Sequence, residues 1–192
     1  MKIMVLLVTL LVSMAAIAAK PVINLSITSV AGAISPVAAW SVTGAVSCAG
    51  SGAWSGQKPL SGTETLPPQT ANGEITLTCV SDKGTSTVEW TVPTQNTNGS
   101  ALTNLAGYYI HEGAVSGMLF ITLSVDNPAI TALDVESPPG PRYWAMRAVD
   151  SAGEQSDLTP EVTKIVQADT ATKTVPFTVQ TVPNAPSNIT IK

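Results

Sequence analysis

The chain has 192 residues, of which 44% are hydrophobic and 11% are charged, whereas an average soluble domain is about one-quarter charged. Nine Lys and Arg residues face 13 Asp and Glu residues, so the net charge is −4 and the composition disfavours binding to a phosphate backbone. The low charge also excludes a highly charged disordered chain, while 24 Thr and 18 Ser with scattered Gly and Pro favour strands over helices.

Residues 1–19 form a hydrophobic leader in which Lys2 precedes an uncharged stretch that ends in small residues at Ala16-Ile17-Ala18. A basic start, an apolar stretch and a small-residue end predict a secretory signal peptide, cleaved after Ala18 or Ala19. The alternative is a retained hydrophobic helix. Such a helix would contact a membrane through residues 3–19, or a partner in a particle that is assembled without export.

Residues 20–92 are expected to form a first β-sandwich, because apolar and polar residues alternate along short segments that turns separate. The clearest of these segments are Ile23–Ile27, Ala38–Val42, Glu74–Val80 and Thr85–Val92. Cys48 and Cys79 are the only cysteines, and an even pair in an exported chain predicts one disulfide. Two thiols without a nearby histidine do not favour a zinc site.

The run Trp40-Ser-Val-Thr-Gly-Ala-Val-Ser-Cys48, followed by Trp54-Ser-Gly56 and Leu77-Thr-Cys79, resembles bacterial immunoglobulin-like repeats of secreted and phage proteins. The resemblance covers residues 21–92 and implies an immunoglobulin-like sandwich bridged by the two cysteines. Leu77 stands where antibody domains carry a tyrosine, so the similarity is to the bacterial branch.

Residues 93–168 are expected to form a second sandwich, with strands in the segments Ala106–Gly113, Phe120–Val125, Ile130–Val135 and Tyr143–Gly153. The series, and above all its ending Ala148-Val-Asp-Ser-Ala-Gly153, resembles a fibronectin type III domain. The resemblance implies that Trp144 and Met146 face inward, and it leaves Arg142 where a corner aromatic is expected. Trp90 ends the first sandwich and also stands where the second strand of a fibronectin type III domain belongs, with no separate first strand before it.

Residues 169–192 are expected to form a C-terminal arm or extra strand, which Pro176 restricts to a sheet edge or an arm. The segment Val182–Ile191 resembles the opening strand of a fibronectin type III domain. We therefore expect an assembly strand that includes Phe177, Ile189 and Ile191. It would fill the vacant edge in the same molecule or, by strand addition, in a neighbouring one. The alternatives are a linker to a further domain and an extension packed on its own domain.

Little in the sequence indicates catalysis. His111 is the only histidine, and we expect it to be an exposed strand residue rather than a general base. The carboxylates are scattered at turns and strand ends instead of being paired for acid–base work. The sequence shows no phosphate-binding loop and no calcium-binding loop, so it predicts no enzyme, cofactor or metal site.

The sequence favours binding through loops over catalysis. Trp54 is the candidate exposed aromatic for stacking on a sugar or a protein; the alternative is a tryptophan folded over its own sheet edge. Asn96 and Asn98, in a polar loop, are candidates for hydrogen bonding to a polar surface, and Tyr109 is a further surface candidate. The other tryptophans, which lie in strand registers, are expected in the core: Trp40, Trp90 and Trp144.

Together these patterns predict an all-β chain of two tandem immunoglobulin-like sandwiches, with a hydrophobic N-terminal segment and an extended C-terminal arm. The predicted function is that of a structural, decoration or host-surface-contact protein of a bacteriophage virion, whose partners are other virion or cell-surface proteins. The alternative is an adhesion or carbohydrate-binding accessory protein, exported to the periplasm or the extracellular space, whose partner is a surface glycan.

Overall fold

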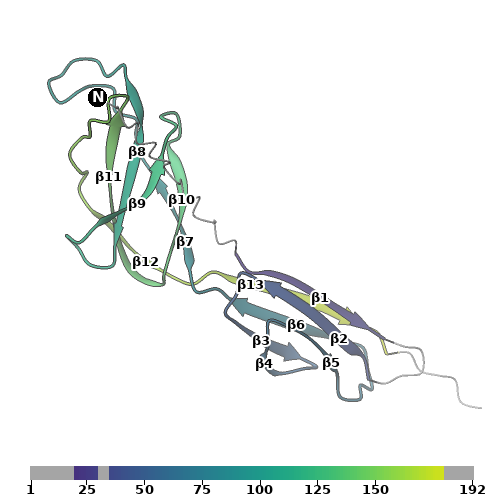
Figure 1. Cartoon of the computed structure of the whole chain (residues 1–192). Helices are drawn as coiled ribbons and strands as arrows, with labels where there is room; N and C mark the ends of the chain where they lie inside the picture. Colours follow the sequence, from purple (N-terminus) through teal and green to yellow (C-terminus); the bar gives the residue numbers. More distant parts are fainter. Residues whose placement is uncertain (1–19, 30–34, 180–192) are drawn as a thin grey trace, which may run out of the picture.

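The described part of the chain is built from β-strands (Figure 1). The computed structural model describes residues 20–29 and 35–179, and it has thirteen strands and no helix in these ranges. The all-β prediction is therefore confirmed for this part of the chain. Within the same ranges no helix is long and apolar enough to cross a bilayer.

One pair of sheets encloses the first hydrophobic core. A three-stranded sheet in the order β1-β2-β5 faces a four-stranded sheet in the order β13-β6-β3-β4. The strands are β1 (Val22–Thr28), β2 (Val37–Thr43), β3 (Ser47–Gly52), β4 (Gly56–Lys58), β5 (Ser61–Thr65), β6 (Gly73–Val80) and β13 (Thr170–Phe177). The side chains that meet between these sheets include Leu25, Trp40, Ile75, Leu77 and Phe177.

A second pair of sheets encloses a separate core. The two-stranded sheet β10-β7 faces the four-stranded sheet β12-β11-β8-β9. The strands are β7 (Gly84–Glu89), β8 (Leu105–Gly113), β9 (Phe120–Val125), β10 (Ala132–Ser137), β11 (Gly140–Asp150) and β12 (Val162–Val166). The core side chains include Tyr108, Ile110, Val135, Trp144 and Met146, so the expected inward positions of Trp144 and Met146 are confirmed.

Strand β6 shows why these residues form strands. Ile75, Leu77 and Cys79 are fully buried on one face of β6, as the alternation of the sequence predicts. On the opposite face Thr76 and Thr78 share hydroxyl hydrogen bonds of 2.9 and 3.2 Å with threonines of β13. Threonine therefore suits the outer face of the sheet: its β-branched side chain favours a strand, and its hydroxyl is polar without carrying a charge.

Two strands belong to other sheets than the expected boundaries at residues 92 and 168 imply. Strand β7 was expected to close the first sandwich, yet it pairs with β10 in the second sheet pair. Strand β13 falls in the expected arm, yet it pairs with β6 along its whole length, and the Phe177 ring lies in the first core. The six strands from β7 to β12 are therefore inserted between two neighbouring strands of the first sheet pair.

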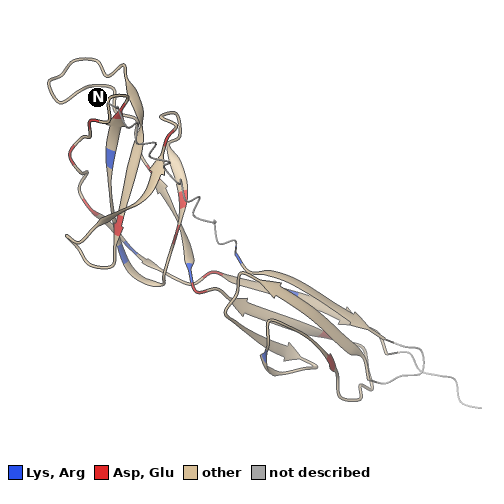
Figure 2. Cartoon of the chain, viewed as in Figure 1, with Lys and Arg blue, Asp and Glu red and all other residues tan. Residues whose placement is uncertain are grey.

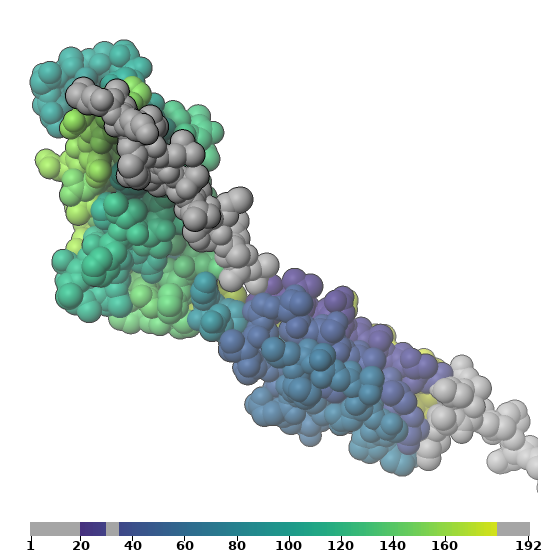
Figure 3. Space-filling view, viewed as in Figure 1, coloured from purple at the N-terminus to yellow at the C-terminus, as the bar shows by residue number. Residues whose placement is uncertain are grey.

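Two segments cross between the sheet pairs, side by side. Asp169 accepts a backbone hydrogen bond from Ser81 (2.9 Å) and donates one to the carbonyl of Lys83 (2.8 Å). Its carboxylate also accepts hydrogen bonds from the amide and hydroxyl of Thr85, at 3.3 and 2.6 Å. Figure 3 shows the narrow junction between the two bodies, and the ribbon in Figure 1 shows that the chain passes out and returns there.

Candidate functional site

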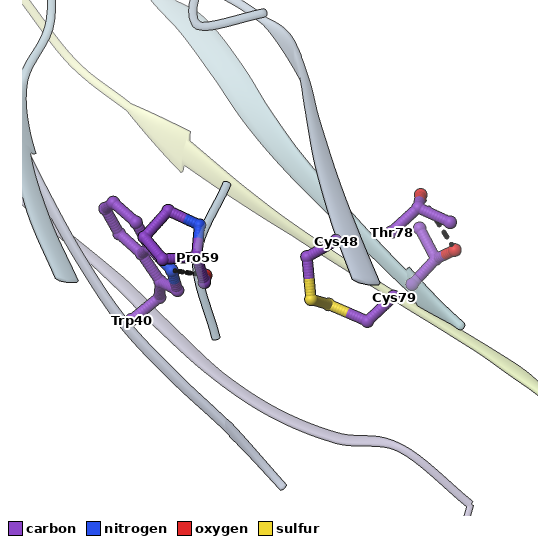
Figure 4. The surroundings of a disulfide bond; sticks show 6 residues. Trp40, Cys48, Pro59, Thr78 and Cys79 are labelled. Atoms are coloured by element: carbon purple, nitrogen blue, oxygen red, sulfur yellow. Dashed lines mark hydrogen bonds between the residues drawn. A yellow bond between two sulfur atoms is a disulfide. The ribbon is translucent and has the colours of Figure 1, made fainter. Parts of the chain in front are cut away.

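The predicted disulfide is present, and it joins neighbouring strands of one sheet. Cys48 of β3 and Cys79 of β6 are register partners, with Cα atoms 4.1 Å apart, and both are buried (Figure 4). The indole of Trp40, drawn in the same view, donates a 2.8 Å hydrogen bond to the carbonyl of Pro59. The disulfide therefore links two strands of the sheet that covers the first core. It supplies no reactive thiol, and the described residues hold no free cysteine.

Trp54 is a core residue, so the expectation of an exposed aromatic is wrong. Its side chain is only 2% exposed, its indole nitrogen donates to the carbonyl of Thr76 at 3.2 Å, and its ring meets that of Trp40 edge-on at 4.9 Å. The ammonium of Lys58 lies 4.7 Å from the ring centroid and pairs with Glu64 at 2.5 Å. The loop folds inward because burying a large ring and satisfying its N–H is more favourable than leaving both in water.

The polar loop that contains Asn96 and Asn98 is closed by its own hydrogen bonds. The side-chain oxygen of Asn98 accepts from the amide and the hydroxyl of Ser100, at 3.0 and 2.7 Å. The amide of Gly99 donates to the carbonyl of Asn96 at 2.9 Å, and Gly99 has a φ of 83°, which glycine adopts without steric cost. Asn96 helps Asn98 fix the shape of the loop, because its side-chain amide donates to the hydroxyl of Ser100 at 2.9 Å and to the carbonyl of Ala101 at 3.3 Å. Asn96 also lines a neighbouring hollow.

This hollow is the best-formed candidate site, and we call it the tip hollow. It has a volume of about 200 Å³ and lies between the polar loop and the turn that follows β11. Its floor is apolar, with Leu102 and Leu105, and its rim is polar, with Gln95, Asn96, Glu154 and Gln155. Amides and carboxylates around an apolar floor can hydrogen-bond a small polar group, for example a sugar hydroxyl, and pack against its carbon skeleton.

Asp150 builds the wall of the tip hollow and joins its two sides. One carboxylate oxygen accepts from the backbone amides of Ala152 and Glu154, both at 2.9 Å, and the other accepts from the side chain of Asn104 at 2.8 Å. These hydrogen bonds, with that from Glu154 the largest, lower the pKa of Asp150 below its ordinary value. The side chain therefore stays ionised and holds the loop against the turn.

The structure does not bring the other candidate residues to this hollow. Tyr109 is half-buried on β8, in register with Arg147 of β11 and Ser124 of β9, where it lines a different hollow on the sheet. Phe177 is 5% exposed inside the first core, so it is not available as an exposed assembly residue. The remaining predicted residues and segments, namely Ile189, Ile191 and the leader over 1–19, lie outside the described residues.

His111 is buried, which corrects the expectation of an exposed strand histidine. Only 8% of the residue is exposed, and its Nε2 atom has no hydrogen-bond partner among the described residues. Burial, and in second place the charge of Arg147, lowers its pKa below the ordinary 6.5. His111 is paired in register with Ala145, which is buried as well.

Charged residues are scattered over the described chain rather than gathered on one face (Figure 2). In those residues no group of three or more His, Cys, Asp or Glu side chains is arranged to hold a metal ion. The candidate site is thus the tip hollow, which supplies neutral amides and carboxylates on a scaffold of strands.

No protein-family model matches the chain, and no curated protein matches it in sequence.

Proposed function

We propose that the protein is a non-enzymatic structural component of a bacteriophage virion, in which two immunoglobulin-like sandwiches, the second resembling fibronectin type III, hold a contact surface away from the particle. The tip hollow is that surface, and it meets the host surface or a neighbouring virion protein. Loops suit this role because a rigid scaffold fixes their geometry while their sequence stays free to serve recognition.

The observation that carries this proposal is the two-segment crossing between the sheet pairs. A single linker leaves two bodies free to swivel, whereas two adjacent segments tied by Asp169 resist rotation. Strand β7 starts at this crossing and the polar loop follows its far end, so the tip hollow lies at the end of the second sheet pair remote from the first (Figure 1). The arrangement is that of a stiff spacer with a recognition tip.

The intact mass of the native protein tests this assignment. A virion component retains the full mass from Met1 to Lys192 when it is isolated from purified particles. A mass that begins near Ala19 or Lys20 and is found outside particles, lighter by the two hydrogens of the disulfide, overturns the virion assignment and supports export.

The second candidate function is that of an exported adhesion or carbohydrate-binding protein, and the composition of the tip hollow favours it. Amide and carboxylate groups above a leucine floor match the hydroxyls and carbon skeleton of a sugar. Binding to an array of bacterial surface glycans tests this function. Loss of binding in Asn96→Ala and in Gln155→Ala, with retention in the control Tyr109→Ala outside the hollow, supports it.

A further inference from the structure

One side of the second sheet pair is open along β7. Among the described residues β7 pairs only with β10, and the Trp90 amide donates to the carbonyl of Thr131 on that side at 2.9 Å. Because residues of an antiparallel strand alternate in direction, the amide and carbonyl groups of Thr87 and Glu89 point away from β10. These groups form a free edge that accepts another strand.

An apolar hollow lies next to this edge, and we call it the side hollow. It has a volume of about 180 Å³ and is lined by Trp90 and Pro93 on one side, and by Met146, Ala148 and Thr159 on the other. Trp90 meets the ring of Tyr108 at 5.2 Å, and its buried indole nitrogen has no hydrogen-bond partner among the described residues. A strand added to β7 would cover the side hollow.

We propose that residues 183–191 of a second copy of this chain pair with the free edge of β7 and place Ile189 and Ile191 over the side hollow. In this segment the isoleucines alternate with Asn188 and Thr190, so one face is apolar and the other polar. The apolar face matches the hollow, and the backbone groups of the segment complete the hydrogen bonding of Thr87 and Glu89.

The path of β13 indicates that the donor is a neighbour rather than the same molecule. Thr170 lies in register with Val80, close to the start of β7, and Phe177 lies in register with Gly73, at the far end of the first sheet pair. The chain is still held there at Val179, whose amide donates to the side chain of Asn72 at 2.9 Å.

A return within the same molecule would have to retrace the eight residues of β6, about 26 Å at roughly 3.3 Å per residue. Such a return would use residues 180–187, and the segment would then run parallel to β7 and begin only at Gly84. The segment of a neighbouring copy is not limited by the length of a return path or by its direction, so it can pair antiparallel along the free edge of β7.

Donation from copy to copy joins unlike surfaces, and such a contact builds a ring where the rotation between copies closes and an open chain of molecules where it does not. This inference deepens the proposed structural role by naming the partner of the second sheet pair as another copy. It does not depend on the tip hollow, which stays free at the end of each copy.

Two full-length variants separate the donor from the acceptor. The donor variant carries Ile189→Asp and Ile191→Asp, and the acceptor variant carries Thr87→Pro, which removes an outward amide that the fold itself does not use. The control Thr87→Val loses the same hydroxyl but keeps the amide. All variants retain residues 1–19, so assembly through the leader would persist in each of them.

We expect the wild type and Thr87→Val to form species of increasing mass as their concentration is raised, measured by light scattering after size exclusion. Each variant alone stays at the monomer mass, and a 1:1 mixture of the two gives a species of twice that mass and no larger. As a second measurement, a synthetic peptide of residues 182–192 in excess returns the wild type to the monomer mass, while the peptide with both Asp substitutions does not.

A wild type that stays monomeric, or assembly that persists unchanged in the donor variant, overturns the inference. A mixture that yields no dimer, together with a peptide that has no effect, overturns it equally. Either result leaves the virion assignment standing if the intact chain is still found in particles, so the two proposals fail separately.

Discussion

Removing the disulfide tests how the first core is stabilised. In the double variant Cys48→Ala, Cys79→Ala the two strands remain register partners, since β3 and β6 pair over six positions without help from the sulfurs. The bridge therefore acts mainly by restricting the unfolded chain. For a separation of 31 residues, the chain-entropy relation gives about 3.7 kcal/mol of stabilisation at 25 °C.

Two measurements separate the chain-entropy contribution from packing. Reducing the wild type removes the cross-link but keeps both sulfur atoms, whereas the double alanine variant also removes buried volume at two positions that are at most 2% exposed. We expect the reduced wild type to lose about 3 to 4 kcal/mol and the double variant to lose more, because it also leaves a cavity.

Denaturant unfolding followed by tryptophan fluorescence is the suitable assay. Trp40 and Trp54 belong to the first core, while Trp90 and Trp144 belong to the second, so variants with one tryptophan pair replaced by Phe report on each core. The loss should appear in the transition of the first core. A reduced wild type that loses less than about 1 kcal/mol would refute the reasoning, because the unfolded loop would then already be restricted.

Three further predictions concern the crossing, the buried histidine and the tip hollow. Gly84→Ala places a Cβ 1.7 Å from the carbonyl oxygen of Gln167, so we expect a loss of about 1 to 3 kcal/mol in thermal or denaturant unfolding. The comparison variant Gly99→Ala meets no atom within 4 Å and reports backbone strain alone, about 1 to 2 kcal/mol, because the φ of Gly99 is 83°. The lowered pKa of His111 means that the unfolded chain binds the proton more readily, so this contribution to stability is complete above about pH 6.5 and falls as the pH drops below it. We expect His111→Gln to flatten this part of the profile of melting temperature against pH. A profile that the substitution leaves unchanged would contradict the assignment. The pKa of Asp150 is lowered by hydrogen bonds to the carboxylate rather than by burial, but here too stability falls with falling pH. The stabilisation by Asp150 is present above about pH 3.8 and is lost as the pH falls through the lower pKa of the folded state. Asp150→Ala should therefore melt at a lower temperature than the wild type at neutral pH and approach the wild type in acid.

Much of the local structure could be predicted from alternation. The segments around Ile23, Trp40, Leu77, Ile110 and Leu123 are strands as expected, because period-two patterning determines which side chains lie on the same face. The disulfide followed from the even number of cysteines, and the inward position of Trp144 followed from the resemblance to a fibronectin type III domain. No strand was expected at Gly56–Lys58 or Ser61–Thr65, where small and polar residues mask the alternation, or at Val162–Val166, where apolar and polar residues do not alternate.

The candidate site was predictable only in part. The polar loop was identified from its composition, and Asn96 does line the tip hollow. The opposite side of the hollow, with Glu154 and Gln155, could not be predicted from the sequence. These residues lie beside the polar loop only because Asp150 accepts a hydrogen bond from Asn104, which is 46 residues away in the chain. The prediction that Trp54 is exposed was wrong for a related reason. The sequence of a glycine-rich loop is the same whether its tryptophan points into solvent or packs against the core.

The sequence by itself thus determined the all-β class, the faces of the strands and the disulfide. Only the tertiary structure decided that β13 returns to the first sheet pair, that six strands are inserted before it, and that Phe177 and His111 are buried. The physical reason is the range of the forces involved. Alternation depends on neighbours in the chain, whereas the choice of sheet depends on backbone pairing between β13 and β6 across about 90 residues, which no local pattern encodes.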